Sequence, residues 1–324
     1  MKLSTKLLQL AFLLFCTISY GQYTDVINSN RPGVSRSAYS VGTNVIQGEF
    51  GAKYLKEEHT PLEREVKGFG LDFALRYGLL FEQLEIIVEG NYQNDTETIY
   101  SSSIPFENDR SNFRHFLIGA KYLVYDPYKG LEDKKPNLYS WNANHSFHWK
   151  DLIPAISLYA GANFDSKNNP YTAAGIEGFS PTIMLATQNN FPSGWVFVMN
   201  LVMDRIGTDQ SDFQYIFTLT KAFSAKWVAF GETQGIKSDF YADNLFRLGG
   251  AYLWNRNLQL DTSLTFNTKD TPSVFNVGLG VSYRLDFHKD KVDNNTSADQ
   301  EAKRRANKQR GSGTEPQPQR NTDF

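Results

Sequence analysis

The feature that most constrains the fold is a strict alternation of apolar and polar residues near the end of the chain. Between Phe275 and Phe287 every odd position is apolar, and every even position is polar or glycine. A period of two over this length indicates a β-strand with one apolar face and one wet face. Because a strand tilted across a bilayer needs about 9–11 residues, the run predicts either a membrane-spanning strand or a long strand of a soluble sandwich.

The same alternation recurs along the chain and predicts about twelve strands in all. The expected strands cover 46–54, 66–78, 83–93, 115–124, 155–164, 179–188, 195–203, 213–219, 227–234, 245–254, 258–266 and 274–287. Short turns alternate with longer polar loops, such as those expected at 57–65 and 95–111. This arrangement is typical of outer-membrane barrels and predicts that both barrel ends are periplasmic. The connection 126–152 is long but lies on the periplasmic side, and its Trp, Tyr and Lys residues suit a membrane interface.

The charged residues distinguish the membrane barrel from the soluble sandwich. They fall mostly on the polar faces, whereas a charge on a lipid-facing position would cost about 2–4 kcal/mol at the bilayer midplane. We therefore predict an all-β fold, a transmembrane antiparallel up-and-down barrel of about twelve strands. The candidate lumen and selectivity residues are Glu49, Asp72, Arg76, Glu89, Arg247, Asp261 and Arg284.

Composition divides the chain into four predicted parts. Residues 1–21 have the lysines, apolar run and small residues of a signal peptide, and they contain Cys16, the single cysteine. A lipoprotein site at Cys16 is disfavoured because bulky Phe15 precedes it. Residues 22–43 are expected to form an arm or plug, 44–287 the barrel, and 288–324 a disordered, charged periplasmic tail. The tail is either a solvated extension or a contact to peptidoglycan or a periplasmic protein.

Catalytic and metal-binding signals are weak. The sequence has no phosphate loop, G-x-S-x-G or H-E-x-x-H motif, so we predict no enzyme, no catalytic residues, no cofactor and no metal. His145 and His148 could form a metal pair, but no Asp, Glu or Cys clusters with them. His115 faces the lumen and is interpreted as structural rather than as the base of a lipid-acting enzyme. A net charge of −2 argues against nucleic-acid partners.

Short motifs at both ends of the expected barrel resemble those of a known family. The motifs are 30–35 (NRPGVS), 47–51 (QGEFG), 230–232, 248–252, 258–261 and 278–284. They are similar to outer-membrane "transporter" barrels labelled as a putative meta-pathway of phenol degradation protein, and the similarity covers roughly 28–286. The resemblance implies a barrel in the outer membrane of a Gram-negative bacterium that passes small, hydrophobic or aromatic molecules. It supplies no catalytic residues.

The first functional hypothesis is therefore a passive channel for small-molecule solutes, surrounded by outer-membrane lipids and selective through its charged lumen. Twelve strands enclose less space than a sixteen-stranded porin, so the lumen is expected to be narrow or closed by the arm. The alternative is a structural or accessory subunit of an outer-membrane assembly or secretion complex, with the tail and the connection 126–152 as contact surfaces. A lipid-acting enzyme built around His115 is the third.

Overall fold

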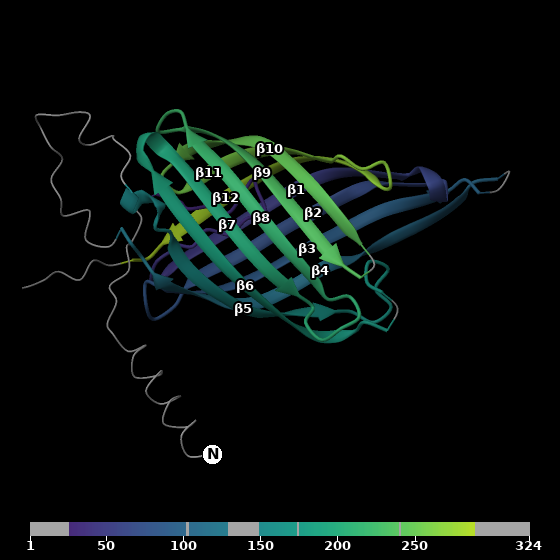
Figure 1. The fold of residues 1–324 in the computed structure, drawn as a ribbon, viewed down its shortest axis with the longest axis horizontal. Helices are drawn as coiled ribbons and strands as arrows, with labels where there is room; N and C mark the ends of the chain where they lie inside the picture. The colour runs from purple at the N-terminus through teal and green to yellow at the C-terminus, as the bar shows by residue number, and fades with distance from the viewer. Residues whose placement is uncertain (1–25, 102–103, 129–148, 174, 240, 289–324) are drawn as a thin grey trace, which may run out of the picture. The chain divides into compact units, whose positions relative to one another are not determined.

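The computed structural model describes residues 26–101, 104–128, 149–173, 175–239 and 241–288. Within them, twelve strands form a closed barrel in which each strand pairs with its sequence neighbours and β12 pairs with β1 (Figure 1). All of the pairings are antiparallel, which confirms the predicted fold class. The strands are β1 Val45–His59, β2 Arg64–Gly78, β3 Leu84–Ile99, β4 Phe106–Tyr125, β5 Ala155–Asp165, β6 Gly178–Phe191, β7 Trp195–Asp204, β8 Asp212–Ala222, β9 Trp227–Ser238, β10 Ala242–Asn255, β11 Leu258–Asn267 and β12 Ser273–Asp286.

Three short 3-10 helices occur in the described residues, at Thr60–Leu62 (η1), Trp149–Leu152 (η2) and Pro192–Gly194 (η3). No helix in this part of the chain is long and apolar enough to cross a membrane. The predicted signal peptide at 1–21, residues 129–148 with His145 and His148, and the tail from 289 onward lie outside the described residues.

Alternation along the strands separates an apolar outer face from a polar inner face. Phe69 and Leu279 point outward and are 67% and 65% exposed, whereas Arg76 and Glu85 point inward and are fully buried. Successive side chains of a strand point to opposite faces, so most apolar residues on the outside have a polar neighbour inside. The polar residues are thereby removed from the lipid-facing surface.

Aromatic residues gather at both edges of the outer apolar band. Trp195, Trp227 and Trp254 are exposed close to the short turns, at the barrel end that carries the first and last strand termini. At the opposite end Phe164 and Phe179 are exposed and make an edge-to-face contact, with ring centroids 6.0 Å apart. Two aromatic girdles flanking an apolar band are the outer surface of a barrel that spans a bilayer.

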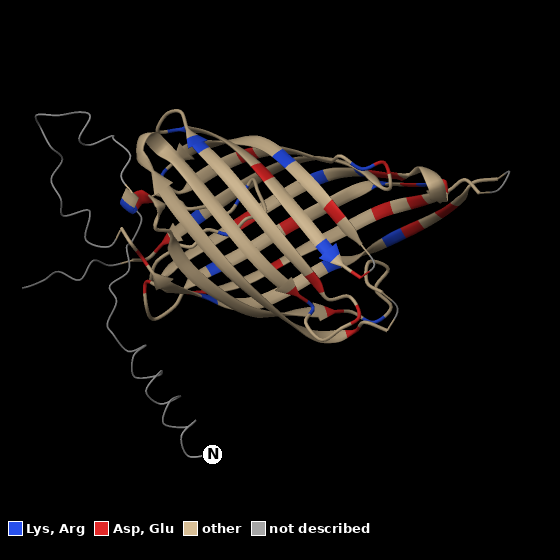
Figure 2. Ribbon diagram, viewed as in Figure 1, with Lys and Arg blue, Asp and Glu red and all other residues tan. Residues whose placement is uncertain are grey.

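Four strands extend farther than the alternation predicted. The loops expected at 57–65 and 95–111 are wrong over much of their length, because β1 to β4 continue through them. Figure 2 shows charged residues concentrated on this extension, and ion pairs such as Arg64–Glu97 link neighbouring strands there. The apolar–polar period ends where the strands leave the apolar band, although backbone pairing continues. Because charged residues occupy both faces there, the alternation could not predict these parts of the strands.

A patch of the inner wall is apolar. Its buried side chains come from six consecutive strands, β3 to β8, and are Ile87, Leu117, Tyr159, Met184, Ala186, Val202 and Ile216. The interior is therefore a mixed core that contains both apolar and charged regions.

An arginine on the outer face is expected to destabilise the barrel. Leu279 lies near the middle of β12 and is exposed on the outer surface, so Leu279→Arg should lower the free energy of unfolding in lipid vesicles by about 2–4 kcal/mol. Leu62→Arg, at the exposed turn between β1 and β2, is the control and should change it by less than about 0.5 kcal/mol. Equal effects of the two variants in urea titrations would contradict the membrane placement of β12.

Candidate functional site

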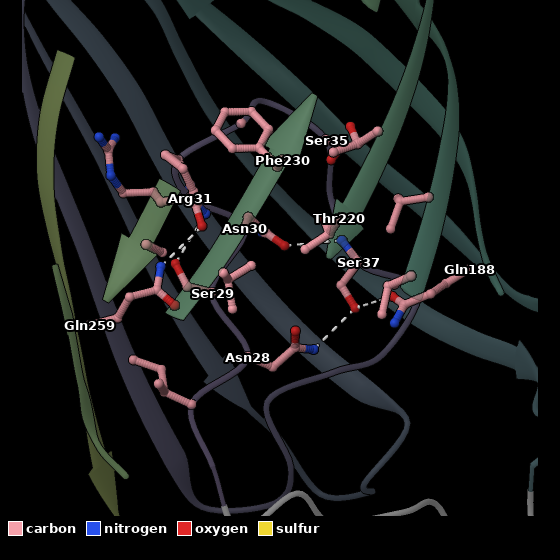
Figure 3. Close-up of a pocket in the computed structure, with 18 residues that line it drawn as sticks. Asn28, Ser29, Asn30, Arg31, Ser35, Ser37, Gln188, Thr220, Phe230 and Gln259 are labelled. Carbon is pink, nitrogen blue, oxygen red and sulfur yellow. Dashed lines mark hydrogen bonds between the residues drawn. The ribbon is translucent and has the colours of Figure 1, made fainter. Parts of the chain in front are cut away.

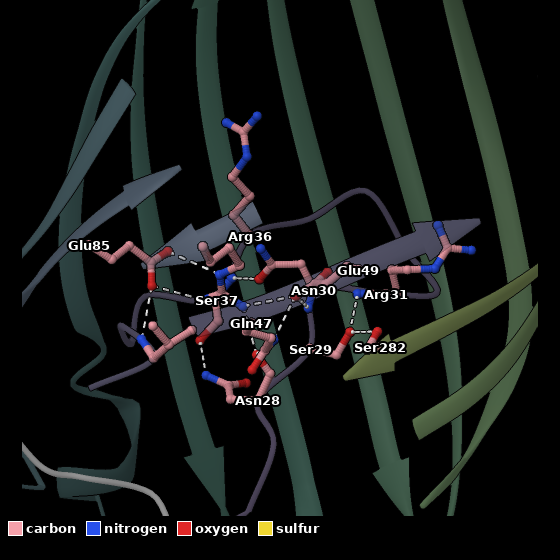
Figure 4. Close-up of polar contacts among 12 residues, drawn as sticks. Asn28, Ser29, Asn30, Arg31, Arg36, Ser37, Gln47, Glu49, Glu85 and Ser282 are labelled. Carbon is pink, nitrogen blue, oxygen red and sulfur yellow. Dashed lines mark hydrogen bonds and ion pairs between the residues drawn. The ribbon is translucent and has the colours of Figure 1, made fainter. Parts of the chain in front are cut away.

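The segment that precedes β1 lies inside the barrel. Residues 26–43, here called the arm, contain no helix or strand and cross the lumen (Figure 4). Because buried backbone N–H and C=O groups need partners, side chains of the inner wall take the place of a strand neighbour. The wall side chains that bond the arm backbone are Gln47, Glu49, Arg76, Glu85, Lys121, Asn200, Glu232 and Gln259.

The first fixed point of the arm is Arg31. Its Nη2 lies 3.1 Å from Oδ1 of Asp261, and its Nε donates to Oδ2 at 3.3 Å. The guanidinium lies against Gly51 and Gly280, which are directly paired between β1 and β12. A Cβ atom at either glycine would fall 2.2–2.3 Å from a guanidinium nitrogen. We call Asp261, Gly51 and Gly280 the Arg31 seat. Any residue larger than glycine at position 51 or 280 would occupy the space of the guanidinium.

Filling the Arg31 seat is expected to loosen the arm. With Ser35→Cys as a buried reporter, Gly280→Val should accelerate thiol labelling by at least about tenfold, because local opening exposes the arm. Gly278→Val is the matched control, since it lies on the same strand and face but its Cβ would meet the rotatable Ser263 hydroxyl rather than the arm. Labelling is followed by mass spectrometry. Equal labelling rates in the two variants would contradict a role of the Arg31 seat in holding the arm.

A second fixed point is the carboxylate of Glu232 on β9. It accepts hydrogen bonds from the backbone N–H groups of Val34 and Ser35, each at 3.1 Å to Oε2. The Thr218 hydroxyl also donates to Oε2 at 2.8 Å, and Arg247 donates to Oε1 at 2.9 Å. Glu232 is buried on the inner face, and its full set of donors compensates the burial of its charge.

Arg36 forms the third fixed point. Its Nε donates to Glu89 Oε2 at 3.2 Å, and its guanidinium lies 4.8 Å from the Tyr159 ring centroid. The side-chain amide of Asn200 accepts from the Arg36 N–H at 2.6 Å and donates to its carbonyl at 2.9 Å. Asn200 therefore replaces both hydrogen bonds that a neighbouring strand would supply at this position.

A buried ionic network lies where the arm leaves the lumen toward β1. Arg76 pairs with Glu49 at 3.1 Å and with Glu85 at 3.0 Å, and Lys121 pairs with Glu85 at 3.0 Å. All four side chains are at most 2% exposed. Two cations and two anions balance, which is the condition under which buried charges are tolerated.

The network also holds the arm. Arg76 donates to the Asn28 carbonyl at 2.7 Å, and Lys121 donates to the Ser37 carbonyl at 2.7 Å. Glu85 accepts from the Val41 N–H at 2.9 Å. The side chains of the network therefore bond both one another and the arm backbone. If the arm moved, Arg76, Lys121 and Glu85 would lose these bonds and would have to be hydrated instead.

The end of the arm nearest β1 is anchored by apolar contacts. Ala38 and Tyr39 pack with Leu123 and Ala155, and Tyr128 packs against this cluster. The arm therefore has a polar portion at 28–37, held by hydrogen bonds and ion pairs, and an apolar anchor at 38–41.

Tyr171, in the segment that follows β5, is fixed to the extended wall at the other end of the barrel. The Tyr171 hydroxyl donates to Asp95 Oδ2 at 2.9 Å, and Arg110 lies 5.5 Å from the Tyr171 ring centroid. Burial, and then the Asp95 carboxylate, raise the pKa of Tyr171, so the phenol stays protonated and continues to donate at neutral pH. These contacts hold Tyr171 against β3 and β4.

All seven predicted lumen residues lie on strands of the barrel with partners inside it. Glu49 and Arg76 belong to the buried network, Asp261 to the Arg31 seat, Glu89 pairs with Arg36, and Arg247 pairs with Glu232. Asp72 pairs with Lys53 at 3.2 Å, and Arg284 pairs with Asp286 at 3.1 Å. The structure joins most of them through the arm, a connection that the sequence did not indicate.

Six further wall residues that bond the arm backbone were not among the predicted site residues: Gln47, Glu85, Lys121, Asn200, Glu232 and Gln259. Glu85, Lys121 and Glu232 could have been added, because they are ionisable groups at inward positions. Asn200 carried a weaker signal, because it is a single amide within the otherwise mostly apolar sequence of β7.

The catalytic and metal alternatives gain no geometric support. His115 lies opposite Asn91 across the β3–β4 pair, and in the described part of the chain no serine hydroxyl is hydrogen-bonded to it. Across the same residues no group of three or more His, Cys, Asp or Glu side chains could hold a metal ion.

A closed barrel with an apolar outer band, two aromatic girdles and a charged interior defines a transmembrane β-barrel of the outer-membrane type. A family model described as "Putative MetA-pathway of phenol degradation" matches residues 29–285. The chain belongs to this family, which confirms the resemblance seen in its motifs.

Solved structures with similar folds are outer-membrane proteins of low sequence identity. The COG4313 outer membrane channel from Pseudomonas putida F1 is 9% identical, with a TM-score of 0.49, covering 80% of this chain and 100% of that chain. The toluene transporter TodX from Pseudomonas putida is 9% identical, with a TM-score of 0.44 and coverages of 83% and 95%. The KdgM porin is 10% identical, with a TM-score of 0.42 and coverages of 74% and 99%. A comparison with curated proteins found no match.

Proposed function

We propose that this protein is an outer-membrane channel for small, hydrophobic or aromatic molecules, which diffuse passively through the lumen when the arm is displaced. The observation that carries the proposal is that one non-covalently held segment, residues 26–43, occupies the interior of an otherwise continuous closed barrel. Family membership supports the solute class, because the family's description refers to phenol degradation.

The chemistry of the contacts supports displacement of part of the arm. Residues 28–37 are held mainly by hydrogen bonds and ion pairs, which water can replace when the charged wall is rehydrated. Residues 38–41 also make hydrogen bonds with Glu85 and Lys121, but Ala38 and Tyr39 are in addition held by apolar burial, which water cannot replace. The arm would therefore open by moving its polar portion while its apolar anchor stays in place.

The inner charges would then select among solutes. Once the arm moves, Glu49, Asp72, Arg76, Glu89, Arg247, Asp261 and Arg284 would border a water-filled passage and form its selectivity lining. We place the barrel end that carries Val45 and Asp286 in the periplasm, because four of its five strand connections are short turns, and outer-membrane barrels have short turns on the periplasmic side.

Solute entry into vesicles tests this function. Vesicles containing the purified mature protein should take up small uncharged aromatic solutes at a rate proportional to the concentration gradient, without an energy source. Solutes larger than the lumen should be excluded, and vesicles without protein give the background for membrane-permeant solutes. Background uptake with both the full-length mature protein and a variant lacking the arm would overturn the channel proposal.

A further inference from the structure

A cavity of about 220 Å³ lies between the arm and one side of the inner wall (Figure 3). The arm forms one of its sides, with residues between Ile27 and Ser37. The opposite side comes from strands β6 to β11 and is mostly apolar, with Val196, Val198, Val228, Phe230 and Ala251 facing the space. The cavity and the apolar patch on β3 to β8 share strands β6 to β8 but are formed by different residues.

The cavity is electrically neutral although the lumen around it is charged. Among the described residues that line it, Arg31 alone is charged, and its guanidinium is paired with Asp261. The charge of Glu232 is directed at the arm backbone, Thr218 and Arg247 rather than at the cavity. A charged molecule placed here would lose its hydration without gaining an ionic partner.

We infer that the cavity is a binding site for an uncharged, mainly apolar molecule of the size of one substituted aromatic ring. The inference rests on the proposed channel function and specifies a site within that passage. An apolar protein cavity of about 150 Å³ holds benzene, so a 220 Å³ space accommodates a ring with one small substituent. The hydroxyl of Thr220, which lines the cavity, can bond a polar substituent of the ligand.

The position of the arm determines whether the site is complete. The Gln259 side chain donates to the Arg31 carbonyl at 3.1 Å, and the Ser37 hydroxyl donates to Gln188 at 2.7 Å. These bonds fix the arm at two edges of the cavity. A molecule in the cavity therefore contacts both the moving arm and the fixed wall, and it leaves when the polar portion of the arm is displaced.

Binding of benzyl alcohol and benzoate to the purified mature protein tests the site. Saturation-transfer NMR in detergent should show that benzyl alcohol binds and that benzoate, of similar size but charged, binds at least about tenfold more weakly. Ala251→Phe, which places a ring in the cavity, should weaken benzyl alcohol binding by at least about tenfold. Ala229→Phe makes the same change at an outward position opposite Gly250 and should leave benzyl alcohol binding unchanged. This variant also controls for partitioning of benzyl alcohol into the detergent micelle.

Folding is checked separately by circular dichroism and heat-modifiable migration, and Val228→Leu provides a smaller cavity-filling change if Ala251→Phe fails to fold. The site would be overturned if benzyl alcohol bound equally well to the wild type, to the cavity-filling variant (Ala251→Phe or Val228→Leu) and to the variant without the arm. Solute uptake with no saturable benzyl alcohol binding would reject the site but retain the channel. Specific binding with no uptake in either the full-length or the arm-deleted protein would reject the channel but retain the site.

Discussion

Deleting residues 22–43 is expected to open the barrel and raise its conductance in planar bilayers by at least about tenfold over the full-length mature protein. The deletion removes the arm from the lumen and leaves a wall whose buried polar groups can be hydrated. It also removes Arg31 and Arg36, the cationic partners of Asp261 and Glu89. The opened passage should therefore prefer cations, measured as a reversal potential in a salt gradient.

A variant lacking only residues 22–25 is the control, since it keeps the described part of the arm. It should conduct like the full-length protein. Low conductance in both deletion variants, with folding confirmed by circular dichroism, would show that the interior stays closed without the arm. A passage that opens but prefers anions would contradict the proposed lining by Asp261 and Glu89.

The largest effect on stability is expected at the buried ionic network. Arg76→Met removes the shared partner of Glu49 and Glu85 and leaves one cation, Lys121, for two buried carboxylates. Breaking a buried ion pair by removing one partner costs about 3–5 kcal/mol. The free energy of unfolding, measured by urea titration in lipid vesicles, should fall by that amount.

Two comparisons isolate the cause of this loss. Arg64→Met removes a partly exposed arginine that pairs with Glu97 on the strand extension, and should cost less than about 1 kcal/mol. Adding Glu85→Gln to Arg76→Met should recover part of the lost stability, because one uncompensated carboxylate is then neutral. A loss in Arg76→Met no larger than that in Arg64→Met would show that the network is hydrated rather than buried.

The alternation of residues predicted which side of each strand faces lipid, because the side-chain period of a strand is fixed by its backbone. It therefore placed Arg76, Asp261 and Arg247 inside correctly. It did not predict the strand extension, where charged residues such as Lys56 and Glu97 occupy both faces and the period disappears.

The path of the arm could not be read from the sequence for a different reason. Its partners lie far away in the chain: Arg31 and Asp261 are 230 positions apart, and Ser37 and Gln188 are 151 positions apart. Nothing in the local pattern of 26–43 encodes those pairings, which depend on strand order and register. The cavity was hidden for the same reason, because it forms only where the arm meets the wall.

The Arg31 seat has a consequence for the order of assembly. Gly51 belongs to the first strand, Gly280 to the last and Asp261 to the last but one, and the two glycines face each other across the seam where the barrel closes. The complete seat therefore forms only when the final strand pairs with the first. The guanidinium of Arg31 contacts both β1 and β12, so the segment that fills the lumen also bridges the strand pair that closes the barrel.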